Sequence, residues 1–366
     1  MSSNYFSTPC PIKRKVSISS LHLVVQSCDA ALSGLVESVN VEDYPTSDFS
    51  ILRTDFLSLL SIIYAATTKV ALSLKPSEPH HKASLVPLRD LANNVAALVH
   101  SIRLMRLQEG STIMAEYEKV AKSVIISVKG LAEALLQADP KAYLVRTGEI
   151  HELIDFARKA GGLSQNNFEA VRRLWLQEHD SLVDGYEEIQ EICKKDSEDG
   201  NEDGEDALED GWEEFGISSD KKLSPVEFER AEKVQAIVKL VILLHKRISR
   251  DTLSADGVKN DNSTLDKLSS LSNRLLTASD DLISSMYPYH DLANIKTCLI
   301  SFWDIIKKLR VTILTSHDET LEGQLKDMSL SSGDKSKKWF STCFDQIDIT
   351  AAKIMDSLQQ KTRTDS

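Results

Sequence analysis

Apolar side chains recur at alternating steps of three and four residues through most of this 366-residue chain. This spacing places them on one face of an α-helix, whereas a half-buried strand would show an apolar residue at every second position. No segment of the sequence shows comparable strand alternation. The spacing therefore predicts an all-α protein. The most regular stripe consists of Leu292, Ile295, Leu299, Phe302, Ile306, Leu309 and Ile313.

Residues that cap or break helices separate the apolar stripes. Pro76 and Pro79 end one segment, because proline lacks the N–H group that a helix interior needs. Ser224, Pro225 and Glu227 have the order of a capping box with proline at the first helical position. Stripes and breaks together predict ten helices, at 17–40, 47–74, 82–108, 112–138, 142–160, 164–194, 224–251, 263–284, 290–316 and 335–360.

A strongly acidic run interrupts this pattern. Between Asp196 and Glu214, eleven of nineteen positions are Asp or Glu, and no Lys or Arg balances them. Such a segment buries too little apolar surface to fold alone.

Short turns make successive helices antiparallel. We therefore expect two antiparallel helical bundles joined by a disordered acidic linker, with a flexible tail at 1–16, an N-terminal bundle at 17–195, the linker at 196–220 and a C-terminal bundle at 221–362.

Charge and composition exclude several classes of protein. The formal net charge is −12, but the residues outside the acidic run carry only about −1. No broad basic face is evident, so direct nucleic-acid binding is not expected. Lys246, Arg247 and Arg250 close a predicted helix, where cations favour the negative end of the helix dipole. The uncharged apolar run from Phe56 to Thr68 is too short to span a membrane, so no membrane partner is expected.

No residue pattern indicates catalysis. The sequence has no nucleophile elbow, phosphate-binding glycine loop or dinucleotide fingerprint. Its nine histidines are scattered, and only His80 and His81 are adjacent, which does not provide the ligand spacing of a zinc site. The five cysteines form no C-x-x-C pair, as is typical of a reduced compartment. We expect a non-enzymatic protein without catalytic residues, metal or cofactor.

Two groups of aromatic residues are candidates for binding a partner. Trp212 and Phe215 lie at the end of the acidic run, next to Glu213 and Glu214, as in an acidic-aromatic recognition peptide. The alternative is that the run is only a tether. Trp175, between Leu174 and Leu176, could belong to a second, outward-facing apolar surface. A long helix that packs on both sides would explain Trp175 equally well.

A longer stretch carries a family resemblance. Residues 280–288, Asp-Asp-Leu-Ile-Ser-Ser-Met-Tyr-Pro, and the stripe from Leu292 to Ile313 resemble the C-terminal signature of the cyclin-D-binding protein family, also called cyclin-D-interacting or maternal Id-like proteins. Proline disfavours a helical conformation at the preceding residue, so a helix should end at the Tyr287–Pro288 step. Members of the family typically have a second proline where this chain has Tyr289. The likeness covers roughly residues 20–360.

The resemblance implies an all-helical adaptor of the nucleus and cytoplasm, similar in architecture to the vinculin and α-catenin bundles. It implies that the chain regulates cell-cycle progression by binding a protein partner, either a cyclin or a transcriptional regulator. Tyr287 and Pro288, which carry the signature, are then candidate partner-binding residues. The alternative is a structural or cytoskeletal adaptor of the vinculin type.

Overall fold

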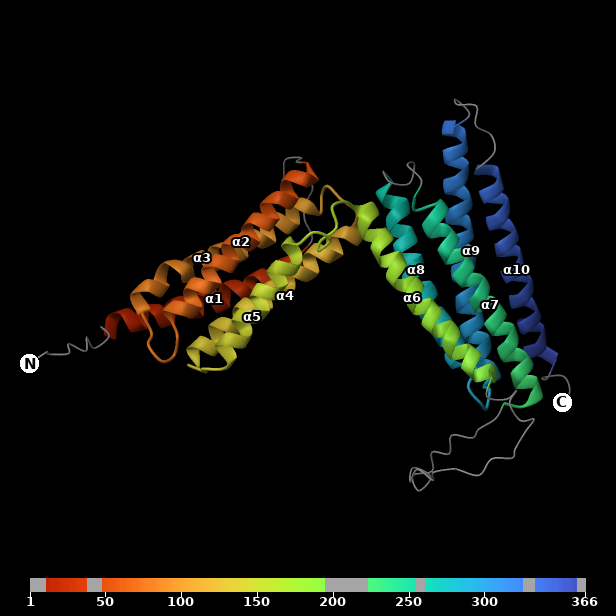
Figure 1. Ribbon diagram of the computed structural model, residues 1–366, viewed down its shortest axis with the longest axis horizontal. Helices are drawn as coiled ribbons and strands as arrows, with labels where there is room; N and C mark the ends of the chain where they lie inside the picture. The colour runs from red at the N-terminus through yellow and green to blue at the C-terminus, as the bar shows by residue number, and fades with distance from the viewer. Residues whose placement is uncertain (1–10, 38–47, 195–222, 255–260, 325–332, 361–366) are drawn as a thin grey trace, which may run out of the picture. The chain divides into compact units, whose positions relative to one another are not determined.

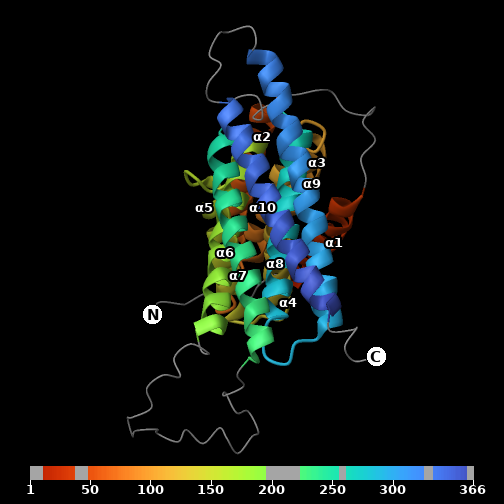
Figure 2. The same cartoon turned by 90° about the vertical axis from the view of Figure 1, so that its right-hand side faces the viewer.

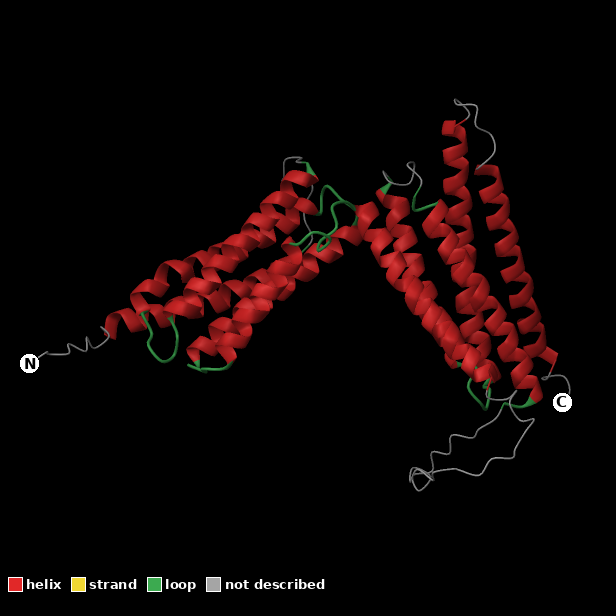
Figure 3. Cartoon of the chain, in the orientation of Figure 1, coloured by secondary structure: helices red, strands yellow, loops and turns green. Residues whose placement is uncertain are grey.

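A computed structural model describes residues 11–37, 48–194, 223–254, 261–324 and 333–360. Every regular element in these ranges is an α-helix (Figure 3), which confirms the all-α prediction. Most helix ends fall within about three residues of the predicted ones, although α1 begins earlier and α9 ends later. The helices are α1 (Pro11–Val36), α2 (Phe49–Ser73), α3 (His81–Met105), α4 (Ser111–Leu136), α5 (Ala142–Arg158), α6 (Asn167–Lys194), α7 (Pro225–Asp251), α8 (Asn262–Ser284), α9 (Leu292–Gln324) and α10 (Gly333–Gln360).

The chain divides into two compact units, Met1–Ala170 and Val171–Ser366. The boundary therefore falls near the start of α6, one helix earlier than the boundary that the sequence predicted. The reason is that α6 buries Trp175, Leu182 and Ile189 within the second unit. The acidic run consequently joins α6 to α7, two helices of the same unit, rather than one bundle to the other. Its residues, 196–220, lie outside the described part of the chain.

The described residues of the first unit form a bundle of helices α1 to α5 (Figure 1). Their contacts close a ring in the order α1, α3, α2, α5, α4. Short connections make α2 to α5 alternate in direction. A ring with an odd number of helices must contain at least one parallel pair, and here that pair is α1 with α3. The hydroxyl of Ser17 lies 3.0 Å from that of Ser84, and Arg103 pairs with Glu37 at the other end of the two helices. The antiparallel prediction is therefore correct except at this pair.

Unit 1 has a continuous apolar core in which Phe56 and Tyr117 are fully buried. The Tyr117 hydroxyl donates to the carbonyl oxygen of Ser164 at 2.9 Å, and burial raises the pKa of Tyr117 to about 12. By length and composition alone, α2 could cross a membrane. In the structure its apolar face, which includes Phe56 and Ile63, packs into this core instead.

In the second unit α7, α8, α9 and α10 are antiparallel and each contacts the next, with α10 returning to α7 (Figure 2). The α9 stripe predicted from the sequence forms the centre of this bundle, because Ile295, Leu299, Phe302 and Ile306 are almost fully buried. Helix α6 lies against α7 and α8. Its Gly185 approaches α8 so closely that a Cβ atom there would lie 3.1 Å from the side chain of Ile283.

Candidate partner-binding surface

The turn between α8 and α9, residues 285–290, contains the Tyr-Pro signature and lies at one end of unit 2. Tyr287 is 51% exposed and Tyr289 is 76% exposed, whereas Pro288 is half-buried. The hydroxyl of Tyr287 donates to Oε1 of Glu188 on α6 at 2.9 Å. The predicted helix end at this step is confirmed, since α8 ends at Ser284. We call residues 285–290 the signature turn.

Glu227 anchors the signature turn to the start of α7. One of its carboxylate oxygens accepts from the backbone N–H of Ser224 at 2.8 Å, which completes the predicted capping box. The other accepts from the backbone N–H of His290 at 2.8 Å. Burial opposes ionisation of Glu227, but the N–H donors of Ser224 and His290 more than offset it, and the pKa falls to about 2. Glu227 is therefore a carboxylate at neutral pH and holds two segments together.

The ring of His290 makes two hydrogen bonds that hold the signature turn in place. Its Nδ1 lies 2.8 Å from Nη1 of Arg230, and its Nε2 lies 3.0 Å from the carbonyl oxygen of Met286. A guanidinium can only donate, so Nδ1 must accept and Nε2 must carry the proton that bonds Met286. This arrangement requires a neutral imidazole. Burial, assisted by the charge of Arg230, lowers the pKa of His290 accordingly.

Carboxylates surround the exposed tyrosine. Burial and the nearby charges of Glu188 and Asp281 raise the pKa of Asp280. The hydrogen bond to Glu188, burial and the charges of Glu188 and Glu191 raise the pKa of Tyr287. The carboxylates that contribute to these two shifts, Glu188, Glu191 and Asp281, lie near the turn. The surface is thus acidic and aromatic, which suits contact with a cationic segment through charge and ring faces.

Tyr289 has a backbone conformation that excludes proline. Its φ is 72°, in the left-handed region that few non-glycine residues adopt. The proline ring fixes φ near −65°, so the second proline of the family pattern could not occupy this position without a different turn. At Tyr289, where the chain departs from the family pattern, the turn therefore has a backbone conformation that proline could not adopt.

Trp175, the second predicted site, is not on a surface. Only 1% of it is exposed, its indole N–H donates to the carbonyl oxygen of His245 at 3.0 Å, and its ring stacks on that of His245. The suggestion that Trp175 binds a partner is therefore corrected: it packs α6 onto α7. Leu176 beside it is exposed, because successive residues of a helix point in different directions. The other predicted residues, Trp212 and Phe215, lie outside the described residues.

Sequence reasoning missed Glu188, Arg230 and His290. The capping box revealed one role of Glu227, but its second bond joins residues 63 positions apart in the chain, and no local pattern signals such a contact. Within the described ranges, no group of three or more His, Cys, Asp or Glu side chains could hold a metal ion. An open groove at the α2–α3 turn, lined by Lys69, Leu72 and Pro87 among others, contains no catalytic arrangement.

In the described residues, two units of packed helices and an exposed aromatic turn define an all-helical bundle protein. Two family models match the chain: Grap2 and cyclin-D-interacting, N-terminal, over residues 55–195, and Grap2 and cyclin-D-interacting, C-terminal, over residues 208–311. Together they span well over half of the sequence, and the chain belongs to the Grap2 and cyclin-D-interacting family. The resemblance inferred from residues 280–313 is thereby confirmed. A search of curated proteins found no match.

Proposed function

We propose that this chain is a non-enzymatic interaction adaptor that regulates cell-cycle progression by binding a cyclin. The observation that carries the proposal is the match of both family models, whose descriptions name interaction with cyclin D. Membership of this family leads us to expect that the chain binds a protein partner, and we propose that this partner is a cyclin. Action in the nucleus and cytoplasm is part of the same proposal, and imaging of the tagged chain in cells would test it.

The signature turn is the surface that we assign to this binding. Tyr287 and Tyr289 project from it, Pro288 stiffens it, and Glu227 and His290 hold its backbone in place. A preformed turn loses little conformational entropy on binding, and exposed tyrosines are frequent anchors of protein interfaces. The adjacent carboxylates add selectivity for a partner with a basic surface.

Binding of the purified full-length chain to a D-type cyclin, measured by calorimetry, tests the proposal. Replacing Tyr287 and Tyr289 by alanine should weaken binding by at least about tenfold, equivalent to about 1.4 kcal/mol. Phe156→Ala is the matched control, because it removes an exposed aromatic ring from unit 1. Equal affinities of the two variants would reject the turn as the site. Failure of the wild-type chain to bind any cyclin, together with co-sedimentation with actin, would favour a cytoskeletal adaptor instead.

Trp212 and Phe215 are proposed as an additional contact. They belong to the segment that follows α6 and precedes α7, and both helices contribute residues next to the signature turn. Substituting both by alanine should weaken cyclin binding further in the full-length chain. An unchanged affinity would leave the acidic run as a connection only.

A further inference from the structure

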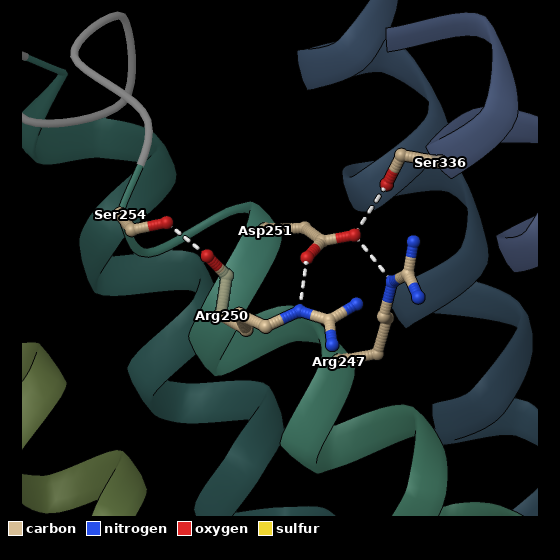
Figure 4. Close-up of polar contacts among 5 residues, drawn as sticks. All are labelled: Arg247, Arg250, Asp251, Ser254 and Ser336. Carbon is tan, nitrogen blue, oxygen red and sulfur yellow. Dashed lines mark hydrogen bonds and ion pairs between the residues drawn. The ribbon is translucent and has the colours of Figure 1, made fainter. Parts of the chain in front are cut away.

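Two largely buried carboxylates lie at helix contacts of unit 2, and their surroundings differ. The first is Asp251, which joins the end of α7 to α10 (Figure 4). Its Oδ2 accepts from the hydroxyl of Ser336 at 2.8 Å and also contacts Arg247. Its Oδ1 accepts from Nε of Arg250 at 2.8 Å. Burial opposes ionisation of Asp251, but these donors more than offset it and lower its pKa, so a paired carboxylate stabilises the contact between α7 and α10.

The second carboxylate, that of Glu178 on α6, has no such pairing. Glu178 is only 5% exposed, and neither of its carboxylate oxygens makes a well-formed hydrogen bond with any residue that the structure describes. Burial therefore raises the pKa of Glu178, although Ser272 and Asn273 of α8 lie close enough to offset part of the effect. A buried carboxyl group without full hydrogen bonding favours any state in which water can reach it.

Two histidines beside Glu178 are also incompletely satisfied. The ring of His179 on α6 is stacked with that of His245 on α7, with 5.6 Å between ring centres and 7° between planes. Nδ1 of each ring is buried and has no hydrogen-bond partner among the described residues. Protonation of either ring would place a charge in this buried contact. We call Glu178, His179, His245 and Ser272 the polar seam of α6.

Few other charged groups face the polar seam. Burial lowers the pKa of His179, and the charges of Asp180 on α6 and Lys246 on α7 act on it in opposite directions. The facing groups of α8 are Ser272 and Asn273, which do not ionise near neutral pH. The ionisable groups of the seam itself therefore dominate its response to pH.

The remaining contacts of α6 are less apolar than those of α9. The face of α6 that packs into unit 2 consists of residues spaced by three or four positions: Trp175, Glu178, Leu182, Gly185 and Ile189. One of these is the buried carboxyl, and another has no side chain, whereas the stripe of α9 is apolar throughout. Because hydrophobic stabilisation scales with the apolar area buried, α6 is held less strongly than α9. Segments that are weakly held open locally, without unfolding of the whole unit.

We propose that α6 detaches from α7 and α8 as one helix while α7 to α10 remain packed, and that the polar seam controls how often it does so. Detachment gives water access to the buried groups of the seam. It also breaks the bond between Glu188 of α6 and Tyr287, so the position of α6 affects the signature turn. The proposal concerns the packing of unit 2 and does not depend on the cyclin assignment.

Hydrogen exchange of the full-length chain, measured by mass spectrometry, tests the proposal. Peptides covering residues 172–186 of α6 are compared with peptides covering residues 295–309 of α9 in the same sample. After correction for intrinsic exchange rates, the α6 amides should open at least about tenfold more often than the α9 amides. Equal opening constants would mean that α6 opens only when unit 2 unfolds as a whole, and would overturn the proposal.

Variants of the polar seam should change the pH dependence of α6 opening in opposite directions. Glu178→Gln leaves the histidines as the titrating groups. Its opening constant should rise about thirtyfold or more from pH 7.5 to pH 5, because His245 has a pKa of about 3 when buried and about 6.5 when detached. His179→Gln combined with His245→Phe leaves Glu178, whose raised pKa makes the docked helix the better proton acceptor. Opening should then decrease over the same range.

A control on the same helix separates the seam from general charge effects. Glu187 is exposed on α6, so Glu187→Gln removes the same charge outside the seam and should keep the wild-type pH profile. The α9 peptides report in every variant whether α7 to α10 remain packed. The same pH slope in the two seam variants, or a change in Glu187→Gln as large as that in Glu178→Gln, would overturn the proposal. So would opening of α6 and α9 in step in either seam variant.

Discussion

The ring of Trp175 stacks on that of His245, with 4.1 Å between ring centres and an angle of 14° between planes. The two residues belong to α6 and α7, and the indole N–H also bonds the backbone of His245. His245 is 1% exposed, and its Nε2 lies 2.9 Å from the hydroxyl of Ser272 on α8. A single histidine thus connects three helices of unit 2, and the protonation of its ring must affect how they pack.

Unit 2 should lose stability in mild acid because of His245. Burial, with a smaller contribution from His179, lowers the pKa of His245 to about 3. Below the ordinary histidine value of about 6.5, the unfolded chain takes up a proton that the folded chain does not, so stability falls by about 1.4 kcal/mol per pH unit until pH 3. The expected loss between pH 6.5 and 5 is about 2 kcal/mol. The lowered pKa of His179 acts in the same direction.

Glu178 opposes this trend, so the test compares variants rather than absolute stabilities. Burial raises the pKa of Glu178, and its protonation therefore favours the folded state as pH falls. His245→Phe keeps a ring against Trp175 and should remove about 2 kcal/mol of the pH dependence between 6.5 and 5. Tryptophan fluorescence during urea unfolding is a suitable measurement, because all four tryptophans follow residue 170. His22→Gln, at an exposed position in unit 1, should leave the profile unchanged.

Glu227→Gln should loosen the signature turn. The depressed pKa of Glu227 stabilises unit 2 above the ordinary glutamate value of about 4.3, and this stability is lost as pH falls toward 2. Because Glu227 is partly exposed to solvent, we expect a loss of about 1–2 kcal/mol in the variant at pH 7, and a smaller difference from wild type at pH 3. Denaturant unfolding at the two pH values measures this. A difference that does not depend on pH would mean that the charge of Glu227 has no role.

Tyr289 offers a test of backbone conformation. Glycine adopts a positive φ without steric cost, so Tyr289→Gly should preserve or slightly increase stability, by up to about 1 kcal/mol. Tyr289→Pro, which restores the family pattern, should instead destabilise unit 2 by more than about 1 kcal/mol. Thermal unfolding of both variants distinguishes the two effects. A stabilising proline would show that the turn rearranges readily.

The α9 stripe provides a core prediction. Phe302 is fully buried at the centre of unit 2, so Phe302→Ala should cost about 3–5 kcal/mol through lost apolar contact and the cavity it leaves. Ile300→Ala, at an exposed position of the same helix, is the control and should change stability by less than about 0.5 kcal/mol. A loss below about 1 kcal/mol for Phe302→Ala would mean that the stripe does not face the core.

The sequence was informative wherever the physical signal is local. The spacing of apolar residues, the Ser224 capping box and the Tyr287–Pro288 step predicted where the helices begin and end. Each of these signals depends only on residues within one or two helical turns. The sequence placed α6 in the N-terminal bundle, and the N-terminal family model also ends at residue 195, whereas the packing groups most of α6 with the second unit. The sequence could not show this packing, because α6 is amphipathic and its apolar face could cover either bundle. Trp175 was misplaced for the same reason: the sequence shows that a helix has an apolar side, not which neighbour covers it. The contacts of Glu227 with His290 and of Asp251 with Ser336 depend on tertiary packing, which no local pattern records.

The acidic run offers a final test, because its two ends attach to helices of one unit. Removing residues 197–216 shortens the connection between α6 and α7, and a shorter loop has a smaller closure entropy, by about 1 kcal/mol for this change in length. The deletion also removes carboxylates from a segment attached near Glu188 and Asp280, whose negative charge is already concentrated. We therefore expect unit 2 to become more stable by about 1 kcal/mol, with a smaller gain at high salt and unchanged circular dichroism per helical residue. A loss of stability on deletion would show instead that the run packs against unit 2 and contributes to its fold.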